Sequence, residues 1–138
     1  EQGMPSGTVI MPVSYEAYAA TTVDEGNLAN NAFDGNLSTR WAAEGDGSWL
    51  LMDLGEVKDL NAFYYSCYLG DQRKQYFTVE VSNDGENFEL VGDVTSSGTT
   101  SEYEYIKLNI QARYVRLTGY GNSAHKWNSF TEVGVCGK

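Results

Sequence analysis

Residues 75–92 carry the strongest local structural signal in the chain. They read QYFTVEVSNDGENFELVG, in which Phe77, Val79 and Val81 alternate with polar neighbours ahead of an Asn-Asp-Gly turn sequence. Alternation with a period of two is typical of a half-buried β-strand, and Asn, Asp and Gly tolerate the positive φ angles that tight hairpin turns require. The segment therefore predicts an antiparallel β-hairpin.

The rest of the chain repeats short apolar segments that end at glycine or alternate with polar residues. They predict further strands over residues 48–55, 60–70, 101–110, 112–121 and 130–137. An edge strand is expected over 8–15, because Pro12 cannot donate a backbone hydrogen bond. About eight short strands without convincing helical periodicity predict an all-β protein, an antiparallel β-sandwich or jelly roll. We expect one domain over residues 1–138, with a short irregular N-terminal lead.

The chain is strongly acidic, since nineteen acidic residues against nine basic ones give a formal net charge of −10. A negative field of this size repels nucleic acid and anionic membranes, so we expect neither as a partner. No apolar run approaches the ~20 residues that a membrane-spanning helix needs, and no basic-then-apolar leader opens the chain. We expect a secreted, extracellular monomer, and the start at Glu1 favours a mature or excised piece of a longer protein.

The sequence offers little support for catalysis. It contains one histidine and no nucleophile motif, which leaves acyl-transfer chemistry without its usual pair of nucleophile and base. Glycoside hydrolysis needs two carboxylates that flank a bond, but pairs such as Glu44 and Asp46 arise by chance in so acidic a chain. We therefore expect a non-catalytic protein.

Two cysteines, Cys67 and Cys136, are too few for a disulfide scaffold and lack the spacing of metal ligands. A bridge between them would close a long loop and stabilise the fold, by about 4 kcal/mol in the chain-entropy estimate. Two buried thiols that pack as small apolar groups are the alternative.

The stretch NAFDGNLSTRW, residues 31–41, gathers oxygen-bearing side chains around a glycine. Asp34, Asn36 and Thr39 offer the hard oxygens that Ca²⁺ prefers, and Gly35 lets the backbone turn its carbonyls inward. The stretch is not an EF-hand, and its single carboxylate is too little charge for a firm calcium site unless a second comes from elsewhere. From the residues alone, a polar turn held by its own Asx and Ser/Thr side chains is the favoured interpretation, with calcium as the alternative.

Five segments occur in a characteristic order: NAFDGNLSTRW, GSWLLMDLG, FTVEVSNDGENF, ARYVRLTGYG and FTEVGV. Together they resemble the discoidin, or coagulation factor C-type, sandwich, and specifically family 32 carbohydrate-binding modules, from about residue 20 onward. Two further stretches, YLGDQRKQYF and GYGNSAHKWNSFTEV, look most like modules attached to alginate lyases. The resemblance implies a discoidin-like sandwich that binds a polysaccharide or oligosaccharide and is covalently linked to a catalytic domain in the full-length protein.

The resemblance also implies a structural calcium ion as cofactor. The oxygen ligands carried over from the family belong to Asn31, Asp34, Asn36, Thr39, Thr131 and Glu132. Glu132 would supply the second carboxylate that the first stretch lacks. The implied fold places Cys67 and Cys136 toward opposite ends of neighbouring strands, which makes a bridge between them doubtful, since a disulfide needs Cα atoms within about 7 Å.

Three long connections, 25–47, 68–76 and 119–129, are the expected places for a ligand, because long loops on a scaffold of short turns tend to carry function. Modules that resemble this one bind sugar through such loops. The loops contain side chains suited to that task, namely Glu44, Asp46, Tyr68, Asp71, Arg73, Lys74, Tyr120, Asn122, His125 and Trp127. Arg73, Lys74 and Lys126 are basic residues in an acidic chain. They favour an acidic polysaccharide such as alginate, because guanidinium groups bind carboxylates through paired bonds.

Several alternatives stay open. A galactose- or galactan-binding module, or a protein or cell-surface adhesion domain of the same fold, would preserve the resemblance without the acidic ligand. Arg73 could pair with Asp71 instead of a ligand, and Trp127 could be core packing. We expect Trp41 and Trp49 to lie in the core, and Arg113 and Arg116 to be structural.

Overall fold

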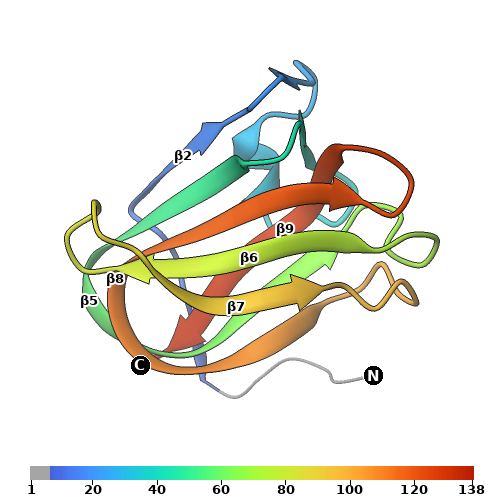
Figure 1. Ribbon diagram of the computed structural model, residues 1–138. Helices are drawn as coiled ribbons and strands as arrows, with labels where there is room; N and C mark the ends of the chain where they lie inside the picture. The colour runs from blue at the N-terminus through green and yellow to red at the C-terminus, as the bar shows by residue number, and fades with distance from the viewer. Residues whose placement is uncertain (1–6) are drawn as a thin grey trace.

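Two long, bent strands organise the structure, a computed structural model that describes residues 7–138. β5 (Ser48–Cys67) and β8 (Glu104–Asn122) run antiparallel to one another (Figure 1). Each strand bends, so that one of its halves lies in one layer of a β-sandwich and the other half lies in the second layer. The first half of β5 pairs with β2, while its second half pairs with β9. The register of β5 breaks between Asp53 and Lys58, where Gly55 adopts a φ of 88°.

The other elements complete the two layers. They are β1 (Thr8–Ile10), β2 (Ser14–Tyr18), β3 (Thr22–Val23), the 3-10 helix η1 (Ala29–Ala32), β4 (Trp41–Glu44), β6 (Gln75–Ser82), β7 (Glu89–Thr95) and β9 (Trp127–Gly137). The strand order is β3-β4-β9-β5-β8-β6-β7, with β1 beside β9 and β2 beside β5, and every pairing is antiparallel. The predicted all-β antiparallel sandwich is confirmed. No helix within residues 7–138 has the length and apolar character to cross a membrane.

Several predicted strand boundaries differ from the observed ones: β9 begins at Trp127 and not at residue 130, and the short strands β3 and β4 were not predicted. The expected strands 48–55 and 60–70 are one continuous strand, because the chain passes Gly55 with a bend and not a reversal. The expected strands 101–110 and 112–121 likewise join in β8. The edge strand expected over 8–15 divides near Pro12 into β1 and β2, which pair with different strands.

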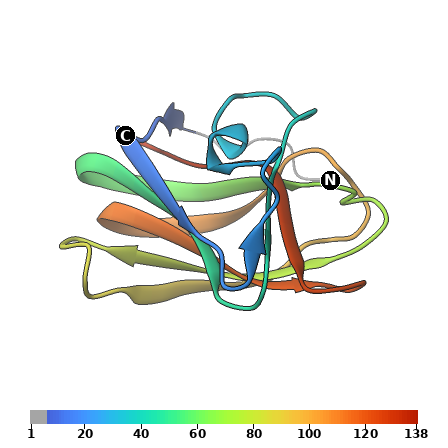
Figure 2. The same ribbon diagram turned by 90° about the horizontal axis from the view of Figure 1, so that it is seen from above.

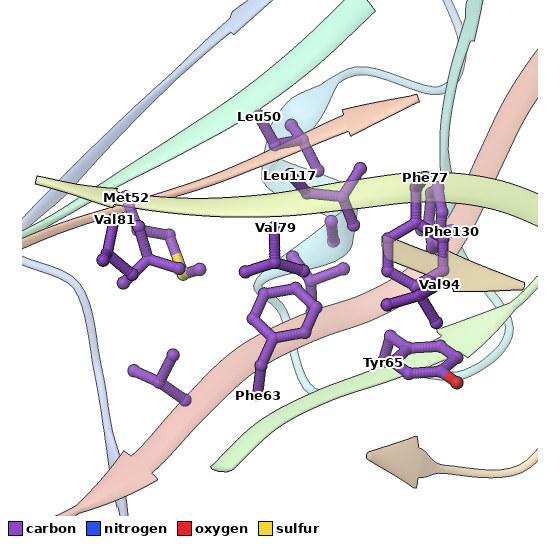
Figure 3. Packing of buried hydrophobic residues seen from close by; sticks show 14 of the residues in the cluster. Leu50, Met52, Phe63, Tyr65, Phe77, Val79, Val81, Val94, Leu117 and Phe130 are labelled. Carbon is purple, nitrogen blue, oxygen red and sulfur yellow. The ribbon is translucent and has the colours of Figure 1, made fainter. Parts of the chain in front are cut away.

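The core lies between the layers and includes the alternating residues of the predicted hairpin. Figure 3 shows Phe77 of β6 beside Phe130, Val79 beside Phe63 and Val81 beside Met52, and all six side chains are buried. The predicted hairpin is therefore confirmed, with Thr78 and Glu80 on the opposite face of β6. Packing of this kind between two inner faces is what holds a β-sandwich together.

Other side chains outside the loops test the remaining expectations. Trp41 is buried as predicted, but Trp49 is only half-buried and stacks on Tyr18, with ring centroids 5.8 Å apart. The prediction for Trp49 was wrong, because it alternates with the buried Ser48 and Leu50 and thus points away from the core. Arg113 and Arg116 have the structural role expected of them, since they pair with Asp53 and Glu80, respectively.

The two cysteines are not joined by a disulfide, and both are buried free thiols. Cys67 lies opposite Phe130 on β9, whereas Cys136 lies opposite Ala62, near the other end of the same pair of strands. The doubt about a disulfide is confirmed, and the thiols pack as small apolar groups.

The hairpin turn between β6 and β7 is held by one carboxylate. Oδ1 of Asp84 accepts hydrogen bonds from the backbone nitrogens of Glu86 and Asn87, at 2.9 and 2.8 Å. Only Gly85 has a positive φ there, so the expected positive φ at the preceding two residues was wrong. The backbone bonds from Asn87 and Glu86 lower the pKa of Asp84 below its ordinary value of 3.8.

This turn predicts a pH dependence of stability. A carboxyl with a lowered folded pKa stabilises the fold above its unfolded pKa, and that contribution disappears as the pH falls through the folded value. Asp84→Asn is therefore expected to lower the urea midpoint at neutral pH and to flatten its decline toward a pH of about 3. Asp93→Asn, an exposed aspartate of the same hairpin without a side-chain hydrogen bond in the described part of the chain, is the control. Parallel pH profiles for the wild type and Asp84→Asn would contradict the assignment.

Candidate functional site

Loops from distant parts of the chain meet at one end of the sandwich. Figures 1 and 2 show the β5–β6 and β8–β9 loops together at this end, and the 83–88 turn at the opposite end. The loops enclose a shallow pocket of about 200 Å³, here called the arginine pocket. Its lining consists of Asp24, Arg40, Tyr68, Arg73, His125, Trp127 and Ser129.

Two guanidinium groups lie beside one aromatic ring in the arginine pocket. Cζ of Arg40 is 3.8 Å from the ring centroid of Tyr68, and Cζ of Arg73 is 5.5 Å from it. Nε of each arginine is buried without a hydrogen-bond partner among residues 7–138. Because buried donors are nearly always paired in native proteins, two guanidinium groups with unsatisfied donors beside one pocket make it a candidate site for a ligand that supplies acceptors.

The electrostatics of the pocket favour an anion. Burial lowers the pKa of Arg73, and the charge of Arg40 lowers it further. Asp24 is the acidic residue of the lining, but its carboxylate accepts hydrogen bonds from Gly26 and Asn27 within its own turn. The two guanidinium cations repel one another, so a negative charge placed near both of them is stabilising.

The β5–β6 loop holds Arg73 through its backbone. Leu69, with a φ of 54°, is the one non-glycine residue with a positive φ among residues 7–138. The backbone nitrogens of Gln72 and Arg73 both donate to the carbonyl of Leu69, at 3.0 and 3.2 Å. Such a conformation costs energy and persists only where surrounding contacts hold it, so the loop carries Arg73 on a constrained turn.

The β8–β9 turn is tied to the neighbouring loop by Asn128. Its Nδ2 donates to the carbonyls of Ala43 and Gly45, at 3.1 Å each, and its Oδ1 accepts from the nitrogen of Gly121 at 2.8 Å. Gly119 has to be glycine here, because a Cβ atom would lie 2.2 Å from Oδ1 of Asn128. The turn bears His125, whose Nε2 is 3.3 Å from Nη1 of Arg73.

The ten candidate carbohydrate-binding residues divide into three groups. Tyr68, Arg73, His125 and Trp127 line the arginine pocket, and Asn122 lies directly behind His125. The other five lie outside the pocket lining, and they are Glu44, Asp46, Asp71, Lys74 and Tyr120. Spacing in sequence could not separate these groups, since all ten lie in the same long loops.

The contacts of the outlying candidates are with the protein itself or with solvent. Asp46 forms an exposed ion pair with Lys126, N to O 3.6 Å, and Asp71 accepts from Ser101 Oγ at 3.3 Å. The alternative pairing of Arg73 with Asp71 is absent among the described residues. Tyr120 is 47% exposed on the outer face of its strand.

Arg40 is the functional candidate that sequence reasoning missed. It immediately follows Thr39 in a stretch interpreted only for its oxygen atoms. One signal was present, because Arg40 is the sole basic residue in the long connection 25–47 of an acidic chain. Its position against Tyr68 depends on the folded loops and not on sequence spacing.

A larger hollow of about 450 Å³ lies elsewhere, toward the C-terminal end of β9. Its lining is polar and aliphatic and includes Asn61, Asn109 and Gln111, with no aromatic side chain. Sugar rings are commonly bound against an aromatic face, which the arginine pocket provides and this hollow does not.

A second cluster gathers the oxygen atoms of the predicted metal ligands. Oγ1 of Thr39 lies 2.5 Å from Oδ2 of Asp34, 3.1 Å from the carbonyl oxygen of Asn36 and 3.4 Å from that of Asn31. Glu132 reaches the same loop from β9, where its Oε2 accepts from the nitrogens of Asp34 and Gly35, at 3.1 and 2.8 Å. Burial and the facing carboxyl of Asp34 raise the pKa of Glu132 to about 7.

Thr131 adjoins this cluster at an irregularity in β9. The register passes from Ser66 opposite Glu132 to Cys67 opposite Phe130, which leaves Thr131 without a partner on β5, as in a β-bulge. Within residues 7–138, no three His, Cys, Asp or Glu side chains lie close enough together to hold a metal ion. Two carboxylates among neutral carbonyl and hydroxyl oxygens nevertheless fit Ca²⁺, which accepts all three kinds of oxygen.

The comparison with known proteins agrees with this architecture. The family model of the F5/8 type C domain matches residues 16–133. The CBM32 of AlyQ, solved in complex with 4,5-unsaturated mannuronic acid, is 41% identical, with a TM-score of 0.83 over 90% of this chain and 94% of that chain. The chain is a family 32 carbohydrate-binding module. As a member of the F5/8 type C family it is a non-catalytic binding domain of a kind found attached to enzymes.

Two further relatives of this family 32 module are larger proteins. A truncated AlyQ with CBM32 and alginate lyase domains is 38% identical with a TM-score of 0.87, over 96% of this chain and 34% of that chain. The polysaccharide lyase 8 family protein HylA of Enterococcus faecalis is 32% identical over 92 residues, which are 64% of this chain and 6% of HylA. The module thus spans about a third of one relative and a small fraction of the other.

Proposed function

We propose that the module binds an acidic polysaccharide such as alginate by holding a uronate carboxylate in the arginine pocket. The observation that carries the proposal is the pair of guanidinium groups beside Tyr68, each with a buried Nε that has no partner among the described residues. Support comes from the AlyQ module at 41% identity, which was solved with an unsaturated mannuronic acid.

The pocket contains the two components that recognition of a charged sugar requires. Arg40 and Arg73 supply planar donors, which bind a carboxylate more strongly than neutral donors bind a hydroxyl. Trp127 is half-buried and lines the pocket, where its indole supplies an aromatic surface for the C–H groups of a pyranose. A pocket of about 200 Å³ suits one sugar unit.

We further propose that the module acts as one part of a secreted enzyme. AlyQ joins a CBM32 to an alginate lyase domain, which supports a covalently linked catalytic domain here. A weakly bound module then raises the local concentration of its enzyme on the polysaccharide. An extracellular location suits a module that acts on large polysaccharides, and because the arginine pocket lies within one chain, a monomer is sufficient to bind.

Calcium is proposed as a structural cofactor at the second cluster. Asp34 and Glu132 would contribute the negative charge, and carbonyl or hydroxyl oxygens of Asn31, Asn36 and Thr39 would complete the shell with Thr131. A bound cation there would join the 31–39 loop to β9. Its role is to hold the loop that ends at Arg40, with no part in binding sugar directly.

The decisive experiment is calorimetry at high protein concentration with three ligands. They are an alginate-derived oligouronate, the same oligosaccharide with its carboxylates reduced to hydroxymethyl groups, and a neutral galactan oligosaccharide. We expect heat with the oligouronate only. Binding of the galactan alone would favour the galactose-type alternative. No binding heat with any of the three ligands would favour the protein-adhesion alternative.

A further inference from the structure

The imidazole of His125 is surrounded by hydrogen-bond donors. Its Nδ1 lies 3.3 Å from the backbone nitrogen of Trp127 and 3.2 Å from Nδ2 of Asn122. Its Nε2 lies 3.3 Å from Nη1 of Arg73. A neutral imidazole has one donor and one acceptor nitrogen, so the ring cannot satisfy the donors on both sides at once.

The orientation of Asn122 is determined by its other contacts. Its Oδ1 accepts from the backbone nitrogens of Ala124 and His125, at 2.8 and 3.0 Å, and its Nδ2 donates to the carbonyl of Trp127 at 2.9 Å. The side chain is 7% exposed, so water cannot readily replace these bonds. Exchanging the amide oxygen and nitrogen would lose all three, and Nδ2 therefore faces Nδ1 of His125 as a donor.

The donors around the imidazole favour one of its two tautomers. Two donors, the backbone N–H of Trp127 and the amide of Asn122, face Nδ1, whereas one donor of Arg73 faces Nε2. A proton on Nε2 leaves Nδ1 free to accept from Trp127 and Asn122. A proton on Nδ1 would leave only the bond from Arg73 to Nε2, so the neutral ring carries its proton on Nε2.

This tautomer leaves a gap for a ligand. The Nε2–H of His125 and Nη1 of Arg73 are then two donors 3.3 Å apart, and no acceptor among residues 7–138 is shared by them, so one ligand oxygen beside the pair could accept from both. Both line the arginine pocket, and His125 is exposed to solvent. Arg40 and Asp24 are the other charged groups of the lining, and the carboxylate of Asp24 is occupied within its own turn.

We propose that one carboxylate oxygen of the uronate lies beside both His125 Nε2 and Arg73 Nη1 and accepts hydrogen bonds from both, an inference that rests on the proposed function. Asn122 is the positioning residue, because it selects the imidazole tautomer that donates into the pocket. An ionised carboxylate oxygen carries no proton and can accept both bonds, whereas a sugar hydroxyl must also place its own proton among donors. The pair thereby discriminates uronates from neutral sugars.

The tautomer can be measured directly, since His125 is the single histidine of the chain. In protein with 15N-labelled histidine, long-range proton–nitrogen spectra at neutral pH are expected to show a bare Nδ1 and a protonated Nε2, both before and after adding the oligouronate. Asn122→Asp replaces the amide donor by an acceptor, so it is expected to move the proton to Nδ1 and to weaken oligouronate binding. A proton on Nδ1 in the wild type would overturn the proposal.

Two substitutions of His125 test the contact with ligand. A glutamine amide reaches the position of Nε2, whereas an asparagine amide reaches only that of Nδ1. We expect His125→Gln to keep affinity for the oligouronate within about 3-fold and His125→Asn to lose about 10-fold, as for one charge-assisted bond. Equal losses in the two variants, with wild-type melting temperatures, would overturn this proposal and leave the proposed function standing. No oligouronate binding by the wild type would overturn both.

Discussion

Replacing Arg73 by alanine is expected to weaken oligouronate binding by roughly 10- to 100-fold, because hydrogen bonds to charged groups contribute about 1.5–3 kcal/mol. The guanidinium of Arg73 lies in the pocket beside Tyr68 and His125, and its Nε is buried without a partner in the described part of the chain. Calorimetry against the oligouronate gives the change in affinity.

The neighbouring Lys74 provides a matched control. It carries the same charge one residue later, but it is exposed and does not line the pocket. Lys74→Ala is therefore expected to change affinity less than about 2-fold, because exposed charges in salt solution interact weakly over distance. Equal losses in the two variants would show that binding depends on overall charge, and the arginine pocket would then not be the uronate site.

Removing calcium is expected to lower the melting temperature of the wild type by roughly 10 °C. A cation present at 100 times its dissociation constant stabilises the fold by about 2.7 kcal/mol, and each kcal/mol shifts the melting temperature of a domain of this size by about 3–4 °C. The physical reason is that the ion would join the loop around Asp34 to Glu132 on a distant strand. Differential scanning calorimetry with calcium and with a chelator measures the shift.

Glu132→Gln is the variant that tests the calcium site. The amide oxygen can still accept from the nitrogens of Asp34 and Gly35, so the loop keeps these contacts while the site loses one carboxylate. We expect the variant to melt at the same temperature with calcium and with chelator. Magnesium is not expected to replace calcium, because it demands a smaller and more regular shell of oxygens. If the wild type melted at the same temperature with calcium and with chelator, a stabilising calcium ion would be ruled out.

Much of the fold could be predicted from alternation alone. Phe77, Val79 and Val81 point to one side because side chains alternate along a strand, whatever the strand pairs with. The strand boundaries were predicted wrongly where alternation gives no information, because it does not show whether a strand ends or bends. Gly55 was interpreted as the end of a strand, but the strand bends there and continues into the other layer of the sandwich.

The two clusters differ in how far the sequence could predict them. The oxygens of Asp34, Asn36 and Thr39 are close neighbours in the chain, so a local stretch indicated their chemistry, and the family resemblance added Glu132. The arginine pocket has no such local stretch. Tyr68, Arg73, His125 and Trp127 were candidates among ten, and the sequence offered no means to separate them from the rest.

The sequence by itself determined an all-β antiparallel fold, an acidic body and the long loops of the chain, all of which follow from residue type and short-range spacing. The resemblance carried by five ordered segments added the F5/8 type C kind of sandwich. Tertiary structure alone decided that Arg40 meets Arg73 beside Tyr68, and that Asn122 and Trp127 direct His125 into the same pocket. The reason is physical: the contacts join three loops from distant parts of the chain, and only the folded strands bring these loops to one end of the sandwich.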